Sequence, residues 1–209
     1  MQLFIDDAEV QHEVPTAGTL EETVRFVQSD VCPPGRLIVR LRYNGDEVKE
    51  NQMTGVLKTP ANSCQRLELF TGTPEKLVAE AMEQASAALS NSEEASRDAA
   101  GLLTEGDSRG GIKALGECIG IWQQIHEAVV KSIQMLEIDP NTTRINELPL
   151  ADAIGKPGEV LLQIKRALEM QDHVQLADVL IYELHDATEL WKAILAELHT
   201  QAVQKREKG

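Results

Sequence analysis

The sequence predicts an α+β protein of two domains, a small sheet-containing domain over residues 1–72 and a helical domain over residues 73–209. The amino-acid pattern changes at Thr71-Gly72-Thr73-Pro74. Before this junction, short apolar segments alternate with turn residues, which is typical of strands. After Pro74 no proline occurs until Pro140, and alanine, leucine, glutamate and glutamine predominate, which is typical of helices. A chain of 209 residues has room for two such domains.

A β-hairpin and a helix are the first elements that we expect. Residues 2–5 and 9–14 alternate apolar with polar side chains on either side of an Asp6-Asp7 turn. The segment 15–18 then breaks the strand, and Thr16 or Thr19 can cap a following helix. The face that this helix would bury carries Leu20, Val24 and Val27.

Three further strands are expected after the Cys32-Pro33-Pro34-Gly35 break. Residues 37–43 alternate so that one face would be buried, and Asn44-Gly45 is a strong hairpin signal. The buried face would carry Leu37, Val39, Leu41 and Tyr43. A short strand near 47–49, an irregular stretch through 60–63 and a closing strand at 65–70 complete the order β-β-α-β-β-β.

Four short segments of this domain resemble ubiquitin and fall where ubiquitin has corresponding pieces. They are Met1–Ile5, Thr19–Val24, Asn44-Gly45 and Leu67–Leu69. The resemblance spans about a third of the chain and implies a β-grasp fold, with a sheet face that can dock a partner. Ubiquitin-type modifiers end in a free Gly-Gly, whereas Gly72 continues into Thr73-Pro74 and a long helical region. This departure argues against conjugation.

The solvent-facing side of the predicted sheet is a candidate partner-binding surface. Strand alternation places Phe4, Arg40, Arg42 and Arg66 on this side. Arginine and aromatic side chains are enriched at the centres of protein interfaces. The alternative is an ordinary solvated face whose charges discourage pairing between sheet edges.

The helical domain begins with two long antiparallel helices. Thr73-Pro74 is a well-defined helix start, and Gly106-Asp107-Ser108 turns the chain before a second helix that ends at Asp139-Pro140. The first helix has a narrow stripe rich in alanine, at Val78, Ala81, Ala85, Ala88, Ser92, Ala95, Ala99 and Leu102. The stripe of the second comprises Ile112, Leu115, Ile119, Trp122, His126, Val129, Ile133 and Leu136.

Two more helices follow a connector that we place at residues 141–157, with room for a short helix at 150–154. A shorter helix carries Val160, Ile164 and Leu168, and a longer one carries Leu184, Trp191 and Leu198, with a break near Gln171-Asp172. Four helices with paired short turns predict an antiparallel four-helix bundle.

The composition bears on three questions, namely whether the protein binds nucleic acid, inserts into a membrane or lies in the cytoplasm. There are 34 acidic and 20 basic residues, a net charge of −14, so we expect no nucleic-acid partner. We also expect no membrane insertion, because no apolar run approaches the ~20 residues of a membrane span. The start lacks the pattern of a signal peptide, and Cys32, Cys64 and Cys118 form no CxxC pair, which favours the cytoplasm.

The sequence contains no motif that predicts a catalytic residue, a cofactor site or a metal site. The predicted helices contain no Glu-x-x-His pair, and the chain contains neither H-E-x-x-H nor a phosphate-binding loop. His126 interrupts an apolar stripe and could be a pH-sensitive or ligand-binding group. We interpret it as a core histidine or one at the edge of the stripe. The polar residues Tyr182, Glu183, His185 and Asp186 are interpreted as solvated surface.

These features favour a non-enzymatic interaction protein, an adaptor or chaperone. The grooves of the bundle, with Trp122, His126 and Trp191, could hold an apolar helix face of a partner. Residues 172–184 look like helical proteins of bacterial motility systems, and the bundle resembles flagellin export chaperones, which implies a role in motility or secretion. One alternative is a small-molecule-binding protein or enzyme with its site in the inter-domain cleft, near His126 or Trp191. Another is a structural subunit that forms a homodimer through the alanine stripe.

Overall fold

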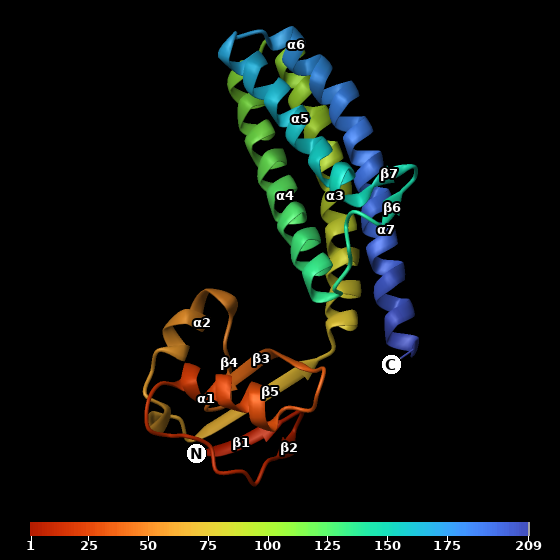
Figure 1. Ribbon diagram of the computed structural model, residues 1–209. Helices are drawn as coiled ribbons and strands as arrows, with labels where there is room; N and C mark the ends of the chain where they lie inside the picture. Colours follow the sequence, from red (N-terminus) through yellow and green to blue (C-terminus); the bar gives the residue numbers. More distant parts are fainter. Residues whose placement is uncertain (209) are drawn as a thin grey trace. The chain divides into compact units, whose positions relative to one another are not determined.

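The computed structural model describes residues 1–208. The chain divides into two compact units, Met1–Pro74 and a second unit that begins at Glu75. The first contains a mixed five-stranded sheet and the second is largely helical, so the fold is α+β (Figure 1). Among the described helices, none is both long enough and apolar enough to cross a membrane.

The sheet of the N-terminal unit has the strand order β2-β1-β5-β3-β4. The strands are β1 (Gln2–Ile5), β2 (Ala8–Glu9), β3 (Leu37–Tyr43), β4 (Asp46–Glu47) and β5 (Arg66–Gly72). The first and last strands, β1 and β5, are parallel, and the other pairs are antiparallel. This arrangement places the two ends of the unit side by side in the middle of the sheet.

Helix α1 (Leu20–Phe26) begins at a capping box. The hydroxyl of Thr19 accepts a hydrogen bond from the Glu22 backbone N–H (3.4 Å), and the Glu22 carboxylate accepts one from the Thr19 N–H (3.0 Å). Of the two threonines predicted as caps, Thr19 is confirmed. A π-helical turn, η1 (Val27–Val31), continues this helix.

Two further helical segments lie between β4 and β5. They are α2 (Glu50–Leu57) and a 3₁₀ turn, η2 (Ala61–Ser63). The sequence pattern did not predict α2, which is short and contains Gly55. Buried side chains of the sheet and of α1 form the core of the unit, which comprises Leu3, Ile5, Leu20, Val27, Leu41, Val48, Cys64, Leu67 and Leu69.

The predicted strand at residues 9–14 is wrong beyond Glu9. The Val10 N–H still donates to the Leu3 carbonyl (2.9 Å), but the strand β2 itself ends at Glu9. The prediction that Leu37 and Val39 face the core is also wrong, because they are 37% and 43% exposed. A bulge between Ile38 and Arg40 shifts the register of β3 against β5, and burial resumes at Leu41.

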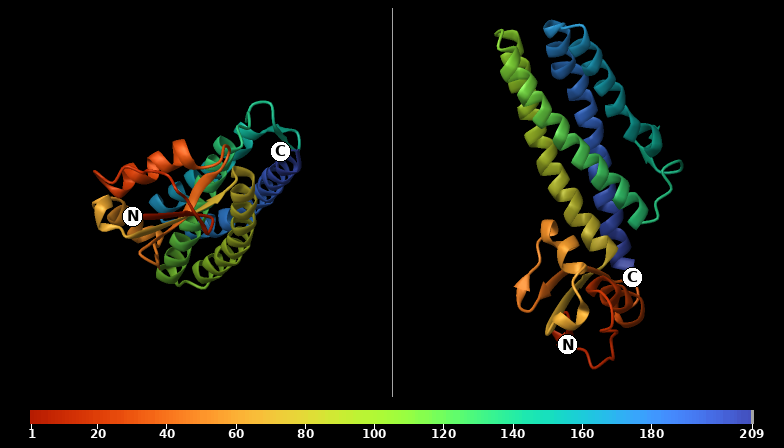
Figure 2. Two further views of the ribbon diagram at one scale, coloured as in Figure 1. Left: turned by 90° about the horizontal axis from the view of Figure 1, so that it is seen from below. Right: turned by 90° about the vertical axis from the view of Figure 1, so that its left-hand side faces the viewer.

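In the second unit, four long helices run side by side and alternate in direction (Figures 1 and 2). They are α3 (Pro74–Thr104), α4 (Ser108–Met135), α5 (Leu150–Glu169) and α7 (Leu184–Lys208). A short helix, α6 (His173–Asp178), and a π-helical turn, η3 (Val179–Glu183), lead into α7. A small hairpin of β6 (Arg144–Ile145) and β7 (Leu148–Pro149) precedes α5.

Aspartate caps mark the turns that the sequence predicts in this unit. The Asp107 carboxylate accepts a hydrogen bond from the Gly110 N–H (3.0 Å), just after Gly106 with φ of +92°. The Asp172 carboxylate accepts one from the Gln175 N–H (2.9 Å) and starts α6. Both positions confirm the predicted breaks between helices.

The predicted connector at residues 141–157 ends too late, because α5 begins at Leu150 and passes through Pro157. Proline lacks an N–H, so the Ala153 carbonyl does not receive its α-helical hydrogen bond from residue 157. Burial of Ala153, Pro157 and Val160 on one face offsets this loss. Apolar burial therefore overrides the helix-breaking tendency of proline here.

The buried faces of α3 and α4 agree only in part with the predicted stripes, of which Val78, Ala85, Ser92, Ala99, Leu115, Trp122, Val129, Ile133 and Leu136 are buried as predicted. In α3, Ala85 and Ala99 are buried, whereas Ala81, Ala88 and Ala95 are half-buried against the core. In α4, the buried residues include Cys118 and Ile125, each adjacent to a residue assigned to the stripe. The alanine stripe thus packs inside the helical unit.

Candidate functional site

Three residues singled out from the sequence meet in the helical unit. Trp122 on α4 and Trp191 on α7 make an edge-to-face contact with ring centroids 5.6 Å apart. The His126 ring lies 5.9 Å from that of Trp191. Residues from two helices, distant in sequence, therefore form one aromatic cluster.

This cluster forms one wall of a partly open pocket of about 460 Å³, here called the tryptophan pocket. Its lining residues are Trp122, Gln123, His126, Glu127, Ile154, Gly155, Pro157, Gly158, Leu161 and Trp191. The opposite wall is the stretch of α5 around Pro157. Space exists there because Gly155 and Gly158 have no side chain, and a Cβ atom added at either meets no atom within 4 Å.

Of the two positions predicted for His126, the edge of the apolar stripe is confirmed and the core is wrong. Its neighbour Ile125 takes the buried position, and His126 is exposed at the edge of the apolar face, against the tryptophan pocket. A stripe that steps by three or four residues allows either position, and burial of isoleucine is favoured over burial of imidazole.

A buried donor without an acceptor lies behind the aromatic wall of the tryptophan pocket. Trp191 is fully buried, and its Nε1 has no hydrogen-bond partner among residues 1–208. The Trp122 nitrogen is near the Cys118 thiol, a weak acceptor, without an ordinary hydrogen bond. Buried polar groups in folded proteins are almost always hydrogen-bonded, so the Trp191 donor requires an explanation.

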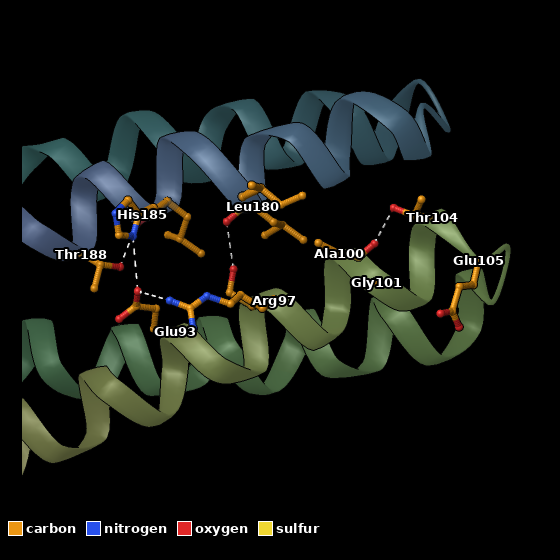
Figure 3. A pocket seen from close by; sticks show the side chains of 12 residues that line it. Glu93, Arg97, Ala100, Gly101, Thr104, Glu105, Leu180, His185 and Thr188 are labelled. Carbon is orange, nitrogen blue, oxygen red and sulfur yellow. Dashed lines mark hydrogen bonds and ion pairs between the residues drawn. The ribbon is translucent and has the colours of Figure 1, made fainter.

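A second pocket, of about 480 Å³, lies between α3 and the η3–α7 segment and is shown in Figure 3. We call it the polar groove. At one end, Glu93 and Arg97 from α3 point toward His185 from α7 (Figure 3). The Glu93 carboxylate contacts Arg97 (2.6 Å), His185 (3.3 Å) and the Lys192 ammonium (3.1 Å). In the middle, the buried Ser96 hydroxyl donates to the Leu180 carbonyl (3.1 Å) in the π-helical turn.

The charges of this polar groove compensate one another. The hydrogen bond from Lys192, together with the charges of Lys192 and Arg97, lowers the pKa of Glu93 although burial opposes the shift. Hydrogen bonds to Glu189 and Glu93 raise the pKa of Lys192. Both shifts favour the ionised forms, as expected of an ion-pair network.

Glu93, His185 and Glu189 offer donor atoms within 4.8 Å of one another. The Lys192 ammonium already lies between the two carboxylates, at 3.1 Å from Glu93 and 2.7 Å from Glu189. A cation bound there would have to displace this ammonium against its two ion pairs. We therefore interpret the cluster as a structural link between α3 and α7.

The thiols of the chain are poor candidates for a nucleophile. Burial raises the pKa of Cys32, of Cys64 and of Cys118. A raised pKa keeps each thiol protonated at neutral pH, and only the thiolate reacts.

In the N-terminal unit, the four predicted surface residues lie on one face of the sheet. Arg66 lies over the Phe4 ring at 4.1 Å, and Arg40 and Arg42 lie over the Phe70 ring at 4.3 and 5.1 Å. Beneath them, Glu68 pairs with Arg66 (2.5 Å) and Arg42 (3.7 Å), and Arg40 pairs with Glu47 (3.8 Å). We call this surface, with its three arginines and two phenylalanines, the arginine face.

Sequence reasoning found Trp122, His126 and Trp191 but did not find their partners. The sequence pattern predicted a loop at Gly155, Pro157 and Gly158, because glycine and proline are typical of loops. In the structure these residues form a wall of the pocket. Phe70 and Glu68 were identified only as strand residues. Glu93 and Lys192 are 99 positions apart on different helices, and no local pattern joins them.

Comparison with known families gives a match to the helical unit. The model of a domain of unknown function (DUF8042) matches residues 80–194, more than half of the chain. This range includes the tryptophan pocket and the polar groove and excludes the arginine face. No curated protein and no solved structure matches the chain.

Proposed function

The chain belongs to the DUF8042 family, and from its surfaces we propose that it is a non-catalytic interaction protein that docks an acidic protein segment on the arginine face. The observation that carries this proposal is the set of three guanidinium groups held over two phenylalanine rings on one sheet face. The rest of the chain is strongly acidic, with a net charge of −14. Three positive groups gathered on one face favour a partner of the opposite charge.

The arrangement of the arginine face favours binding in two ways. The Phe4 and Phe70 rings hold the guanidinium groups through cation–π contacts, which reduces the conformational entropy lost on binding. The Arg40, Arg42 and Arg66 side chains are still 48%, 38% and 47% exposed. Glu68, which two of them share, is 12% exposed, whereas Glu47, the partner of Arg40, is 54% exposed. Three arginines against these two carboxylates leave the face with a net charge of +1.

We also infer that the N-terminal unit has the ubiquitin-like β-grasp fold and that the helical unit is an antiparallel four-helix bundle. The strand order β2-β1-β5-β3-β4, with β1 and β5 parallel and α1 against one face, supports the first inference. The alternating long helices around one apolar core support the second. In this fold the arginine face is the side of the sheet opposite α1, which is free of helices from its own unit and can accept a partner.

Charge reversal on the full-length protein tests the proposal. The double variant Arg40→Glu/Arg66→Glu should abolish binding of a fluorescein-labelled glutamate-rich peptide, measured by anisotropy at low ionic strength. Binding to the unchanged protein should weaken as salt is added, because exposed charges are screened. The matched control is Arg25→Glu/Lys165→Glu, which also reverses two exposed positive charges, on α1 and α5, that pair with Glu21 and Glu169.

Two outcomes would count against the proposal. Equal loss in the double variant and in Arg25→Glu/Lys165→Glu would mean that overall charge, rather than this face, governs the interaction. Binding of a glutamine-for-glutamate version of the peptide with the same affinity would remove the electrostatic basis.

A further inference from the structure

We propose that a groove beside the arginine face holds one large apolar side chain of the acidic segment that docks there. This inference rests on the docking function proposed above and adds a second requirement for the partner. The groove lies among α1, β3 and α2, is partly open and has a volume of about 370 Å³. We call it the valine groove, and its lining includes Val24, Ile38, Val39, Arg40, Met53 and Leu57.

The apolar side chains of the valine groove are accessible to a partner. Val39 is 43% exposed, and the other apolar residues named above, from α1, β3 and α2, are half-buried at the edge of the core. Removal of apolar surface from water is favourable, so a partner side chain placed here gains from contact with several of them at once. The groove therefore fits an apolar side chain better than a charged one.

The β-bulge in β3 places Val39 at this groove. The register with β5 shifts between Ile38 and Arg40 and gives Val39 no partner residue on that strand. Strand alternation without a bulge would put Val39 on the same face as Leu41, which is buried. A bulge re-aims side chains, and bulges are frequent at sheet edges and beside functional sites. The sheet thus presents an exposed valine at one defined position of the groove.

The backbone of β3 beside the groove is already covered by a side chain of α1. The Ile38 N–H donates to Gln28 Oε1 (2.7 Å), and Gln28 Nε2 donates to the Arg36 carbonyl (2.8 Å). A strand edge whose donors and acceptors are satisfied is a poor template for pairing with another strand. The partner is therefore expected to insert a side chain here rather than to add a strand to the sheet.

Arg40 joins the valine groove to the arginine face. It lines the groove, and its guanidinium lies over the Phe70 ring at 4.3 Å. Its ion pair with Glu47 is long, at 3.8 Å, and exposed, so a carboxylate of the partner can replace it. Among the described residues that line the groove, Glu21 is the one carboxylate, and Arg25 pairs with it at 2.9 Å. This continuity and charge select an acidic segment with one apolar anchor.

Two fluorescein-labelled peptides test the anchor on the full-length protein. Both have a run of glutamates on each side of a central residue, which is leucine in one peptide and alanine in the other. Anisotropy at low ionic strength should show that the leucine peptide binds about 3- to 10-fold more tightly, because leucine buries more apolar surface than alanine. Added salt should weaken both peptides and leave the ratio of their affinities unchanged, since salt screens charges.

Val39→Gln should remove the preference for leucine, because it replaces exposed apolar surface of the groove by an amide and leaves the charge unchanged. Leu37→Gln is the matched control and should keep the preference. Leu37 is on the same strand and is exposed to a similar extent, 37% against 43%, but does not line the groove. Both variants should stay folded, because the replaced side chains are exposed. Met53→Ala, on α2, should reduce the preference from another wall of the groove.

The outcomes separate the anchor from the docking function on which it rests. Equal affinities of the two peptides, with loss of both in Arg40→Glu/Arg66→Glu, would overturn the anchor and leave docking on the arginine face in place. A preference for leucine that survives in both Val39→Gln and Met53→Ala, or that disappears equally in Leu37→Gln, would also overturn the anchor. Absence of binding by both peptides would overturn the docking function and the anchor together.

Discussion

Helix α7 borders two pockets of similar size whose polar groups are in opposite states. Toward α3, the groups of Glu93, His185 and Lys192 are paired with one another. Toward α4 and α5, the Nε1 of Trp191 is buried and has no hydrogen-bond partner within the part of the chain that the structure describes. Satisfied polar groups stabilise the contact between helices through their hydrogen bonds, whereas the buried Trp191 side chain contributes through the packing of its ring. Pocket volume alone would not have separated these two cases.

The largest effect is expected at Trp191. Trp191→Ala should reduce the free energy of unfolding by about 3–5 kcal/mol, since it removes a fully buried aromatic side chain. Trp191→Phe should cost clearly less, because no hydrogen bond is lost with the nitrogen. Urea denaturation measures both. If Trp191→Phe proved as costly as Trp191→Ala, the indole nitrogen would have a partner after all, and the contrast between the two pockets would fail.

Substitution of Ser96 tests how much a hydrogen bond of the polar groove contributes to stability. Ser96→Ala removes the hydrogen bond from the buried Ser96 hydroxyl to the Leu180 carbonyl and should destabilise the protein by about 1–1.5 kcal/mol. Ser90→Ala is the control, because the exposed Ser90 hydroxyl bonds only to the Ser86 carbonyl one turn away on its own helix. Similar small effects for both variants in thermal unfolding would show that the contact with η3 contributes nothing specific.

Through Glu93, the polar groove is expected to make the free energy of unfolding depend on pH. Because the pKa of Glu93 is lowered in the folded protein, its contribution is complete above the ordinary pKa of a carboxyl group and is lost as the pH falls through the lowered value. Glu93→Gln should therefore cost about 1 kcal/mol at neutral pH and nothing in strong acid, measured by urea unfolding across pH. Glu94→Gln, at an exposed neighbouring position, is the control. A cost that did not depend on pH would mean that packing, rather than charge, accounts for the role of Glu93.

The smallest expected effect is a gain at Gly155. Gly155→Ala should stabilise the protein by about 0.5–1 kcal/mol, because the new methyl group meets open space on a helix. Gly111→Ala should do the opposite, since its Cβ would lie 2.6 Å from Leu103 and 3.1 Å from the Ala99 carbonyl. Loss of stability at Gly155 would indicate that this wall of the tryptophan pocket is already packed.

Features that depend on local chemistry were predictable from the sequence. The Thr19 cap, the turn at Gly106-Asp107 and the break at Asp172 each follow from a residue and its near neighbours. The alternation of Phe4, Arg40 and Arg42 also placed them correctly on one sheet face.

The features that were missed depend on competition between distant parts. The bulge at Val39 arises from pairing with β5 and has no signal within β3. Pro157 signalled a chain break, but burial of the face that includes Ala153 and Val160 keeps α5 helical. A choice between adjacent positions, such as Ile125 or His126, shifts a helical face by one residue, and only the packed helices decide it.

The π-helical turn η3 sets the angular phase of everything that follows it. A π turn takes up one residue more than an α turn, and each residue in an α-helix rotates the side-chain direction by about 100°. Loss of a single residue between Val179 and Glu183 would rotate the rest of α7 by that angle against its neighbours. His185 would then leave Glu93 and Trp191 would leave Trp122 in one step. The spacing of both pockets is therefore fixed by the length of this turn, which makes the segment far less tolerant of insertion or deletion than of substitution.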